Sequence, residues 1–81
     1  MILLTGGAGY IGSHTALELI NAGFKILVLD NLSNSKVEAI HRTRHLANHN
    51  FEFIEGDIRD RQLLDKIFKN YPITAVVHFA G

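Results

Sequence analysis

Short apolar runs alternate along this chain with segments in which apolar residues recur at helical spacing. A continuous aliphatic run predicts a strand of a parallel sheet that is buried on both faces, because such a strand shows no polar alternation. Apolar residues three and four positions apart share one face of a helix, so that spacing predicts an amphipathic helix. The pattern predicts strands over residues 2–4, 25–30, 51–55 and 74–79, and helices over residues 13–21 and 36–48 and between Asp60 and Tyr71.

Residues at the ends of the helical segments support these boundaries. Gly23 follows the first segment, at the position of a C-terminal cap. Asp60 precedes the third segment, at the position of an N-cap. Tyr71 comes before Pro72, and a residue before proline avoids the helical region. The apolar stripe of this third helix consists of Leu63, Leu64, Ile67 and Phe68.

The alternation of strands and helices predicts an α/β fold. The order β-α-β-α-β-α-β implies a partial Rossmann-type doubly wound parallel sheet with right-handed crossovers and strand order 3-2-1-4. The fourth strand would then be an exposed edge, although its Ala75, Val76 and Val77 are apolar, and such an edge invites aggregation. We therefore expect residues 1–81 to be the N-terminal part of an incomplete domain that lacks its remainder and a substrate domain, and to be poorly soluble.

A glycine-rich turn lies between the first strand and the first helix. Gly6, Gly9 and Gly12 satisfy G-x-x-G-x-x-G, and Gly7, Gly9 and Gly12 satisfy G-x-G-x-x-G. Both patterns allow a sharp turn, a close approach of the backbone to a diphosphate, and tight packing of the helix on the sheet. The first amides of the helix would then point at the anion. No Gly-Lys-Ser/Thr follows, which excludes the phosphate-binding loop of nucleotide hydrolases, and the strand–turn–helix context indicates a dinucleotide site.

Asp30 ends the second predicted strand, 18 residues after Gly12. In a dinucleotide-binding fold an acid at this position faces the ribose attached to adenine. A 2′-phosphate at about 4 Å would be repelled by roughly 4 kcal/mol at an effective dielectric of ~20. Asp30 therefore favours NAD over NADP as the cofactor.

Composition and charge exclude several other classes of protein. Hydrophobic residues make up 47% of the 81 residues and charged residues 20%, which is typical of a packed globular segment. Eight basic residues balance eight acidic ones, so neither nucleic acid nor a membrane is an expected partner. The chain has no cysteine, which excludes disulfides and thiolate metal sites and fits a location in the reducing cytoplasm.

Four segments of the chain resemble the extended short-chain dehydrogenase/reductase family. The glycine turn at 5–14 is similar to the cofactor turn of the whole family. Residues 30–35, 55–60 and 78–81 resemble its UDP-hexose 4-epimerases in particular. The resemblance covers the whole chain and implies that the segment binds NAD.

The resemblance also implies which residues contact the cofactor. Together with Gly6, Gly9 and Gly12 they are Tyr10 and Ile11 at the diphosphate, Asp30 at the ribose, Asn31, Asn34 and Ser35 at the adenosine end, Asp57 and Ile58 at the adenine ring, and Phe79, Ala80 and Gly81 under the nicotinamide half.

The catalytic residues of that family are not present in this sequence. Proton transfer in the family depends on a Tyr-x-x-x-Lys pair, but Tyr10 is followed four positions later by His14, and Tyr71 by Ala75. We assign no catalytic residue and expect this chain alone to be inactive. For the full-length protein the resemblance implies a homodimer that interconverts the C4 epimers of a UDP-sugar through a 4-keto intermediate.

Two other functions stay open. A related nucleotide-sugar dehydratase or decarboxylase would share the glycine turn but agree less over residues 31–35. A non-catalytic NAD sensor would keep residues 6–12 and lack Tyr-x-x-x-Lys in its complete sequence. His41, His45 and His49 have the spacing of zinc ligands on one helix face, but Arg42 and Arg44 lie between them, so we predict a solvated face and no metal.

Overall fold

A computed structural model describes residues 1–33 and 36–79 of the chain. It contains the predicted alternation of strands and helices. The elements are β1 (Ile2–Thr5), α1 (Tyr10–Asn21), β2 (Ile26–Asp30), α2 (Val37–Ala47), β3 (Glu52–Glu55), α3 (Arg61–Asn70) and β4 (Ala75–His78).

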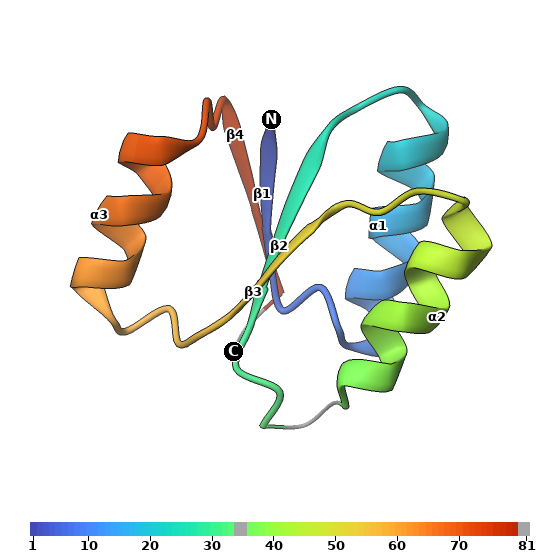
Figure 1. The fold of residues 1–81 in the computed structure, drawn as a ribbon, viewed down its shortest axis with the longest axis horizontal. Coiled ribbons are helices and arrows are strands. Elements are labelled where there is room, and N and C mark those ends of the chain that lie inside the picture. Colours follow the sequence, from blue (N-terminus) through green and yellow to red (C-terminus); the bar gives the residue numbers. More distant parts are fainter. Residues whose placement is uncertain (34–35, 80–81) are drawn as a thin grey trace.

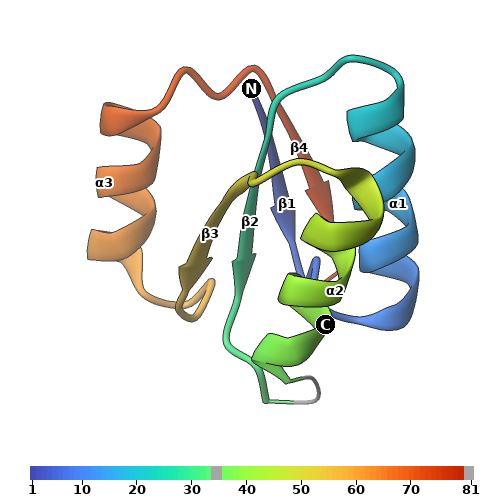
Figure 2. The same ribbon diagram turned by 45° about the vertical axis from the view of Figure 1, so that its right-hand side comes forward.

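The four strands form one parallel sheet in the order β3-β2-β1-β4, as the sequence predicts. Helices α1 and α2 lie side by side against one face of the sheet, and α3 covers the other face (Figure 1). The same three layers are visible after a turn of 45° (Figure 2). The α/β fold class and the doubly wound strand order are therefore confirmed.

Strand β2 is the centre of the core. Ile26 and Val28 belong to the cluster beneath α1 and α2, whereas Leu27 and Leu29 belong to the cluster beneath α3. All four side chains are at most 2% exposed. Each such burial stabilises the fold by roughly 1.5–3 kcal/mol, which explains why the run at 26–29 has no polar member.

The structure confirms the expected helix ends. The Asp60 carboxylate accepts a hydrogen bond from the Leu63 amide at 3.2 Å and caps α3. Gly23 has a φ of +93° just beyond α1. Tyr71 is extended ahead of Pro72 and ends α3. Among the described residues, no helix is long and apolar enough to cross a membrane.

Two expectations from the apolar pattern are wrong in detail. Helix α1 begins at Tyr10 rather than Ser13, because the Ser13 amide already donates to the Gly9 carbonyl at 2.8 Å and closes the first helical turn. Phe68 does not join the buried stripe of α3, since Ile67 takes the inward position and Phe68 is 51% exposed. The edge strand β4 is exposed as expected, with Val76 also 51% exposed.

Candidate dinucleotide site

The turn between β1 and α1 requires glycine at three positions, for two different reasons. Gly6 has a φ of +75°, in the left-handed region that residues with a side chain rarely adopt. Gly12 packs on the turn so closely that a Cβ would meet the Gly6 carbonyl oxygen, and would lie 2.8 Å from the Gly7 Cα. Gly7 is restricted by packing as well, since a Cβ there would lie 2.7 Å from the Val28 Cγ1, so the turn uses the glycines of both overlapping patterns.

The turn leaves the N-terminus of α1 without a side-chain cap. Gly9 is the N-cap residue, and no side chain accepts a hydrogen bond from the first amides of the helix. The Ser13 amide makes the first helical bond, so those of Tyr10, Ile11 and Gly12 have no acceptor within the helix. Because the helix dipole adds positive potential at the same place, this end of α1 suits an anion.

Two large apolar side chains mark the same helix start. Tyr10 is 81% exposed and Ile11 is 64% exposed. The Tyr10 ring contacts the His14 ring edge to face, with the ring centroids 4.7 Å apart. Exposed side chains of this size next to a glycine turn are typical of a surface that a ligand covers.

The carboxylate of Asp30 connects the glycine turn to the loop after β2. Its Oδ2 accepts from the Ala8 amide at 3.0 Å, and its Oδ1 accepts from the Leu32 amide at 2.7 Å. A carboxylate has about four acceptor positions, so roughly two remain open. Two open positions fit the two hydroxyls of a ribose. The bond from Ala8 was not foreseen, although an acid at the end of the strand beside the turn indicates such a contact.

The loop after β2 begins in a fixed conformation. The Asn31 side-chain oxygen accepts from the Ser33 amide at 3.0 Å. Leu32 has a φ of +58°, which costs a residue with a side chain roughly 1–3 kcal/mol and is offset here by its bond to Asp30. The predicted contacts of Asn34 and Ser35 lie outside the described residues.

The loop after β3 holds Asp57 against Arg59. The Arg59 Nη2 lies 2.8 Å from the Asp57 Oδ2, and the Arg59 backbone amide donates to Oδ1 at 2.8 Å. The side-chain hydrogen bonds of Arg59 hold the pKa of Asp57 well below its usual range, and the pKa of Arg59 is raised in turn. Ile58 is half-buried against the core cluster beneath α3. Arg59 thus forms a surface ion pair with Asp57, and the Asp-x-Arg spacing just after β3 is the signal in the sequence for this partner.

The carboxyl end of β4 lies beside the carboxyl end of β1, where the glycine turn begins. The Phe79 amide donates to the Thr5 carbonyl at 2.8 Å. The hydroxyl of Thr5, which is buried, is hydrogen-bonded to the His78 Nδ1 at 2.6 Å. Thr5 and His78 occupy paired register positions, which is the signal that could have found this bond. The Phe79 side chain is 40% exposed rather than part of the core. Ala80 and Gly81 lie outside the described residues.

Those of the predicted site residues that the structure describes lie together at the carboxyl ends of the strands. The Gly56 amide donates to the Asp30 carbonyl at 3.0 Å, which ties the loop after β3 to the end of β2. Since the carboxyl ends of all four parallel strands meet at this edge, the glycine turn, Asp30, Asp57 and Phe79 lie together there. Ligands of open α/β sheets bind in the crevice at that edge.

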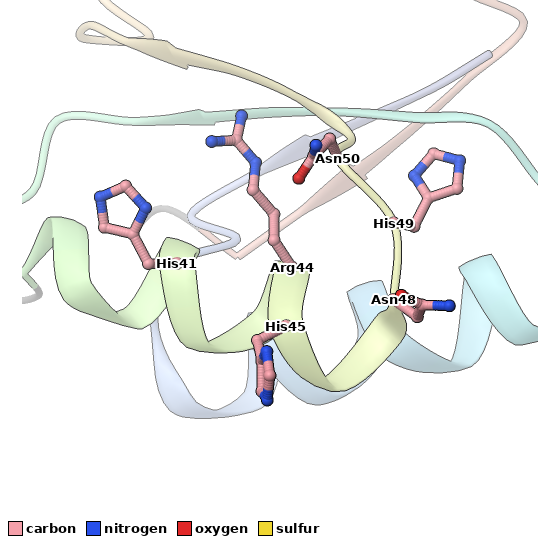
Figure 3. A pocket seen from close by; sticks show the side chains of 6 residues that line it. All are labelled: His41, Arg44, His45, Asn48, His49 and Asn50. Carbon is pink, nitrogen blue, oxygen red and sulfur yellow. The ribbon is translucent and has the colours of Figure 1, made fainter.

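A separate pocket of about 370 Å³ lies where α2 ends and β3 begins (Figure 3). It is therefore near the amino ends of the strands, away from the glycine turn. Its Arg44 donates twice to the Phe51 carbonyl, at 2.7 and 3.1 Å. His45 points away from His41 and His49 in Figure 3, so the three rings do not converge. No group of three possible metal ligands occurs within 1–33 and 36–79.

Several known proteins that are similar to this chain are described as UDP-glucose 4-epimerases. The chain is 56% identical to the UDP-glucose 4-epimerase of Yersinia pestis and 54% identical to that of Bacillus subtilis, over 80 residues in each case. Each alignment covers 99% of this chain and 24% of the relative, so the chain spans about a quarter of the length of these curated relatives.

A solved structure of a UDP-glucose 4-epimerase is also similar to this chain in three dimensions. The crystal structure of UDP-glucose 4-epimerase from Bifidobacterium longum, in complex with NAD+ and UDP, superposes with a TM-score of 0.96 at 39% identity. The superposition covers 99% of this chain and 24% of that protein. These similarities confirm the resemblance that the glycine turn and residues 30–35 indicate.

The chain also matches a known protein family. The family described as GDP-mannose 4,6 dehydratase matches residues 3–81, which is nearly the entire chain. This match includes the glycine turn, Asp30 and the loop after β3. The chain therefore belongs to the GDP-mannose 4,6 dehydratase family.

Proposed function

We propose that this chain is the NAD-binding segment of a UDP-glucose 4-epimerase. The observation that carries the proposal is the junction at Asp30. Its carboxylate is fixed by the Ala8 amide of the glycine turn, beside a helix start that has no side-chain cap. Hydrogen-bond donors for a diphosphate and acceptors for the ribose hydroxyls thereby lie next to each other.

The residues present fit NAD. The amides of Tyr10, Ile11 and Gly12 bind the diphosphate, since the helix supplies them no acceptor. The two remaining acceptor positions of Asp30 bind the ribose hydroxyls, and its charge repels a 2′-phosphate. The remaining proposed contacts are Asn31, Asn34 and Ser35 at the adenosine, Asp57 and Ile58 at the adenine, and Phe79, Ala80 and Gly81 toward the nicotinamide.

The contribution of this segment is binding and orientation of the cofactor. When bound, NAD supplies a hydride acceptor and donor for inversion at C4 of the sugar, with a 4-keto sugar between the two steps. Neither Tyr10 nor Tyr71 has a lysine four positions later, so no residue of this chain is assigned a proton-transfer role. The bound UDP in the Bifidobacterium longum structure supports a UDP-sugar as the substrate of the full-length protein.

A nucleotide-sugar dehydratase is the second candidate, because the matching family carries the name of one. Incubation of the full-length protein with UDP-glucose, followed by chromatography that resolves the C4 epimers and by mass spectrometry, separates the candidates. An epimerase forms UDP-galactose, which has the mass of the substrate, whereas a dehydratase product lacks one water. A non-catalytic sensor would bind NAD and leave the sugar unchanged.

Substitution of Asp30 tests the cofactor assignment. We expect Asp30→Asn to weaken NAD binding about 10- to 100-fold, because hydrogen bonds to a charged group contribute roughly 1.5–3 kcal/mol. The preference for NAD over NADP should also narrow. Isothermal titration calorimetry of the full-length protein measures both affinities, with Asp65→Asn on the exposed face of α3 as the matched control. A variant that folds normally and binds NAD as tightly as the wild type would contradict the assignment.

A further inference from the structure

The Arg44 side chain is fixed at the C-terminal end of α2 by Phe51. Its Nη2 and Nε donate to the Phe51 carbonyl at 2.7 and 3.1 Å, and its guanidinium lies 5.2 Å from the centre of the Phe51 ring. Phe51 is buried in the core, whereas Arg44 is half-buried. Within residues 1–33 and 36–79, no carboxylate lies close enough to form an ion pair with Arg44. The guanidinium is therefore a pre-oriented positive charge that none of these residues neutralises.

Counting hydrogen-bond donors shows what Arg44 can still bind. A guanidinium has five N–H groups. The Phe51 carbonyl takes the edge formed by Nε and one Nη2 hydrogen, which leaves the second Nη2 hydrogen and both Nη1 hydrogens. Phe51 is the one acceptor for this side chain among the residues that the structure describes. The two hydrogens of the terminal edge point the same way, so they match two oxygens of a carboxylate or of a phosphate group.

The pocket around Arg44 is lined by further hydrogen-bond donors. His41 and His49 lie on the two sides of Arg44 in Figure 3, whereas the ring of His45 points away. The volume of about 370 Å³ lies within the range of roughly 300–1,000 Å³ that is typical of small-molecule sites. None of the described lining residues is acidic, so no side chain of the pocket repels an anion. They are His41, Arg44, His45, Asn48, His49 and Asn50.

The negative end of the α2 dipole opposes an anion at this place, but it is the smaller effect. Two carbonyls of the last turn are already bonded, since the Asn48 amide donates to the His45 carbonyl and the His49 amide to the Arg44 carbonyl, each at 3.1 Å. A helix dipole changes the affinity for an ion by about 2- to 5-fold. A hydrogen bond to a charged group strengthens binding by about 10- to 100-fold. The free edge of Arg44 therefore outweighs the dipole, and the pocket favours an anion.

We propose that this pocket binds the phosphate group of a small molecule, with the terminal edge of Arg44 as its anchor. A phosphate monoester carries a charge of about −1.5 to −2 at neutral pH and presents three acceptor oxygens in different directions. Those directions suit the fork of Arg44 together with a donor from His41 or His49, whereas a carboxylate offers two oxygens in one plane. The inference is independent of the proposed function, since the pocket lies away from the glycine turn.

The test follows Arg44 itself in the full-length protein. With ¹⁵N-labelled arginine, NMR shows one Nε–H signal for each arginine, and Arg44→Lys identifies the signal of Arg44 by removing it. NAD is added to saturation, so that phosphate does not report on the glycine turn. Inorganic phosphate and glycerol 3-phosphate, titrated at constant ionic strength, should each shift the Arg44 signal saturably. Acetate should bind about 10-fold more weakly, and chloride should leave the signal in place. Equal affinity for acetate, an equal shift with chloride, or no shift with either phosphate would overturn the proposal.

Matched variants separate a defined site from a general effect of charge, with backbone amide shifts as the measure of phosphate binding. Arg44→Lys keeps the charge but loses the planar fork and should weaken phosphate binding about 10-fold, whereas Arg42→Lys, on the exposed face of α2, should retain the full affinity. Replacing His41 and His49 together by alanine should weaken binding about 5- to 10-fold, and His45→Ala should not. If Arg44→Lys disturbs the fold, the histidine variants decide. An unchanged phosphate affinity in the double histidine variant, or an equal loss in His45→Ala, would overturn the proposal.

Discussion

The turns that lead into α1 and α3 lie at the same edge of the same sheet and solve the same problem in opposite ways. Both must start a helix whose first amides have no partner within it. At α3 the Asp60 carboxylate accepts from the Leu63 amide at 3.2 Å. At α1 the N-cap is Gly9, which has no side chain, and the amides stay without a side-chain acceptor.

The difference distinguishes a turn that stabilises the fold from a turn that we propose binds a ligand. The α3 turn is complete by itself, since its acid comes from the chain. The α1 turn uses four glycines, Gly6, Gly7, Gly9 and Gly12, to form a close bend, and it leaves its positive helix end exposed. Asp30 reaches the α1 turn but accepts from Ala8, ahead of the helix, and so leaves the amides of α1 to an anion from outside.

The largest expected effect comes from filling the bend. Gly12→Ala would place a Cβ against the backbone of Gly6 and Gly7, so the helix start must move. We expect a loss of about 1–3 kcal/mol in the free energy of unfolding. NAD binding should weaken more than about 100-fold, because the displaced amides no longer converge on the diphosphate. Urea unfolding and calorimetry measure the two losses.

A matched glycine at the other end of α1 serves as the control. Gly23 has a φ of +93°, and a Cβ added there meets nothing within 4 Å. Gly23→Ala should cost about 1–2 kcal/mol of stability through backbone strain and leave the affinity for NAD unchanged. Equal losses of affinity in the two variants would show that NAD binding follows global stability rather than the shape of the bend.

Removing the cap of α3 should have a smaller and purely structural effect. Asp60→Ala leaves the Leu63 amide without its acceptor and should lower the free energy of unfolding by about 1 kcal/mol. NAD affinity should not change. Denaturant midpoints are compared with those of Asp65→Ala, which lies exposed on α3 and should shift stability by less than ~0.5 kcal/mol. Loss of NAD binding in Asp60→Ala would erase the distinction between the two turns.

The smallest expected effect is a dependence on pH near the α3 turn. Arg59 lowers the pKa of Asp57 in the folded state, so the pair contributes stability above the unfolded value of ~3.9 and loses it as the pH falls below that value toward the folded pKa. The stability difference between the wild type and Asp57→Asn should be constant from pH 7 to about 5 and should shrink below about 4. In an Arg59→Ala background the same comparison should show no such decline.

The fold could be predicted almost completely because its signals are local and repeated. Four short strand-like segments and three segments of helical period give the strand order, once parallel pairing is assumed. The roles of Asp60 as the N-cap of α3 and of Gly23 beyond the end of α1 could be predicted from their residue type and position. The apolar pattern gave a wrong prediction where two adjacent residues are both apolar. Spacing alone does not show that Ile67 is buried and Phe68 exposed.

The site could be predicted in its positions but not in its connections. The glycine spacing located the turn, but it did not show that Gly6 is required for its positive φ whereas Gly7 and Gly12 are required for close packing. The bonds from Ala8 to Asp30 and from His78 to Thr5 join residues 22 and 73 positions apart. Such contacts depend on strand register, which periodicity does not supply.

The proposed function depends on the uncapped amides of α1 binding the diphosphate of NAD. An NMR titration of the ¹⁵N-labelled full-length protein with NAD tests it directly, because each backbone amide reports separately. We expect the largest saturable changes in amide chemical shift at Tyr10, Ile11 and Gly12, and little change at Leu63 and Leu64. Shifts that centre on the first turn of α3, or saturable binding that leaves the three α1 amides unmoved, would contradict it.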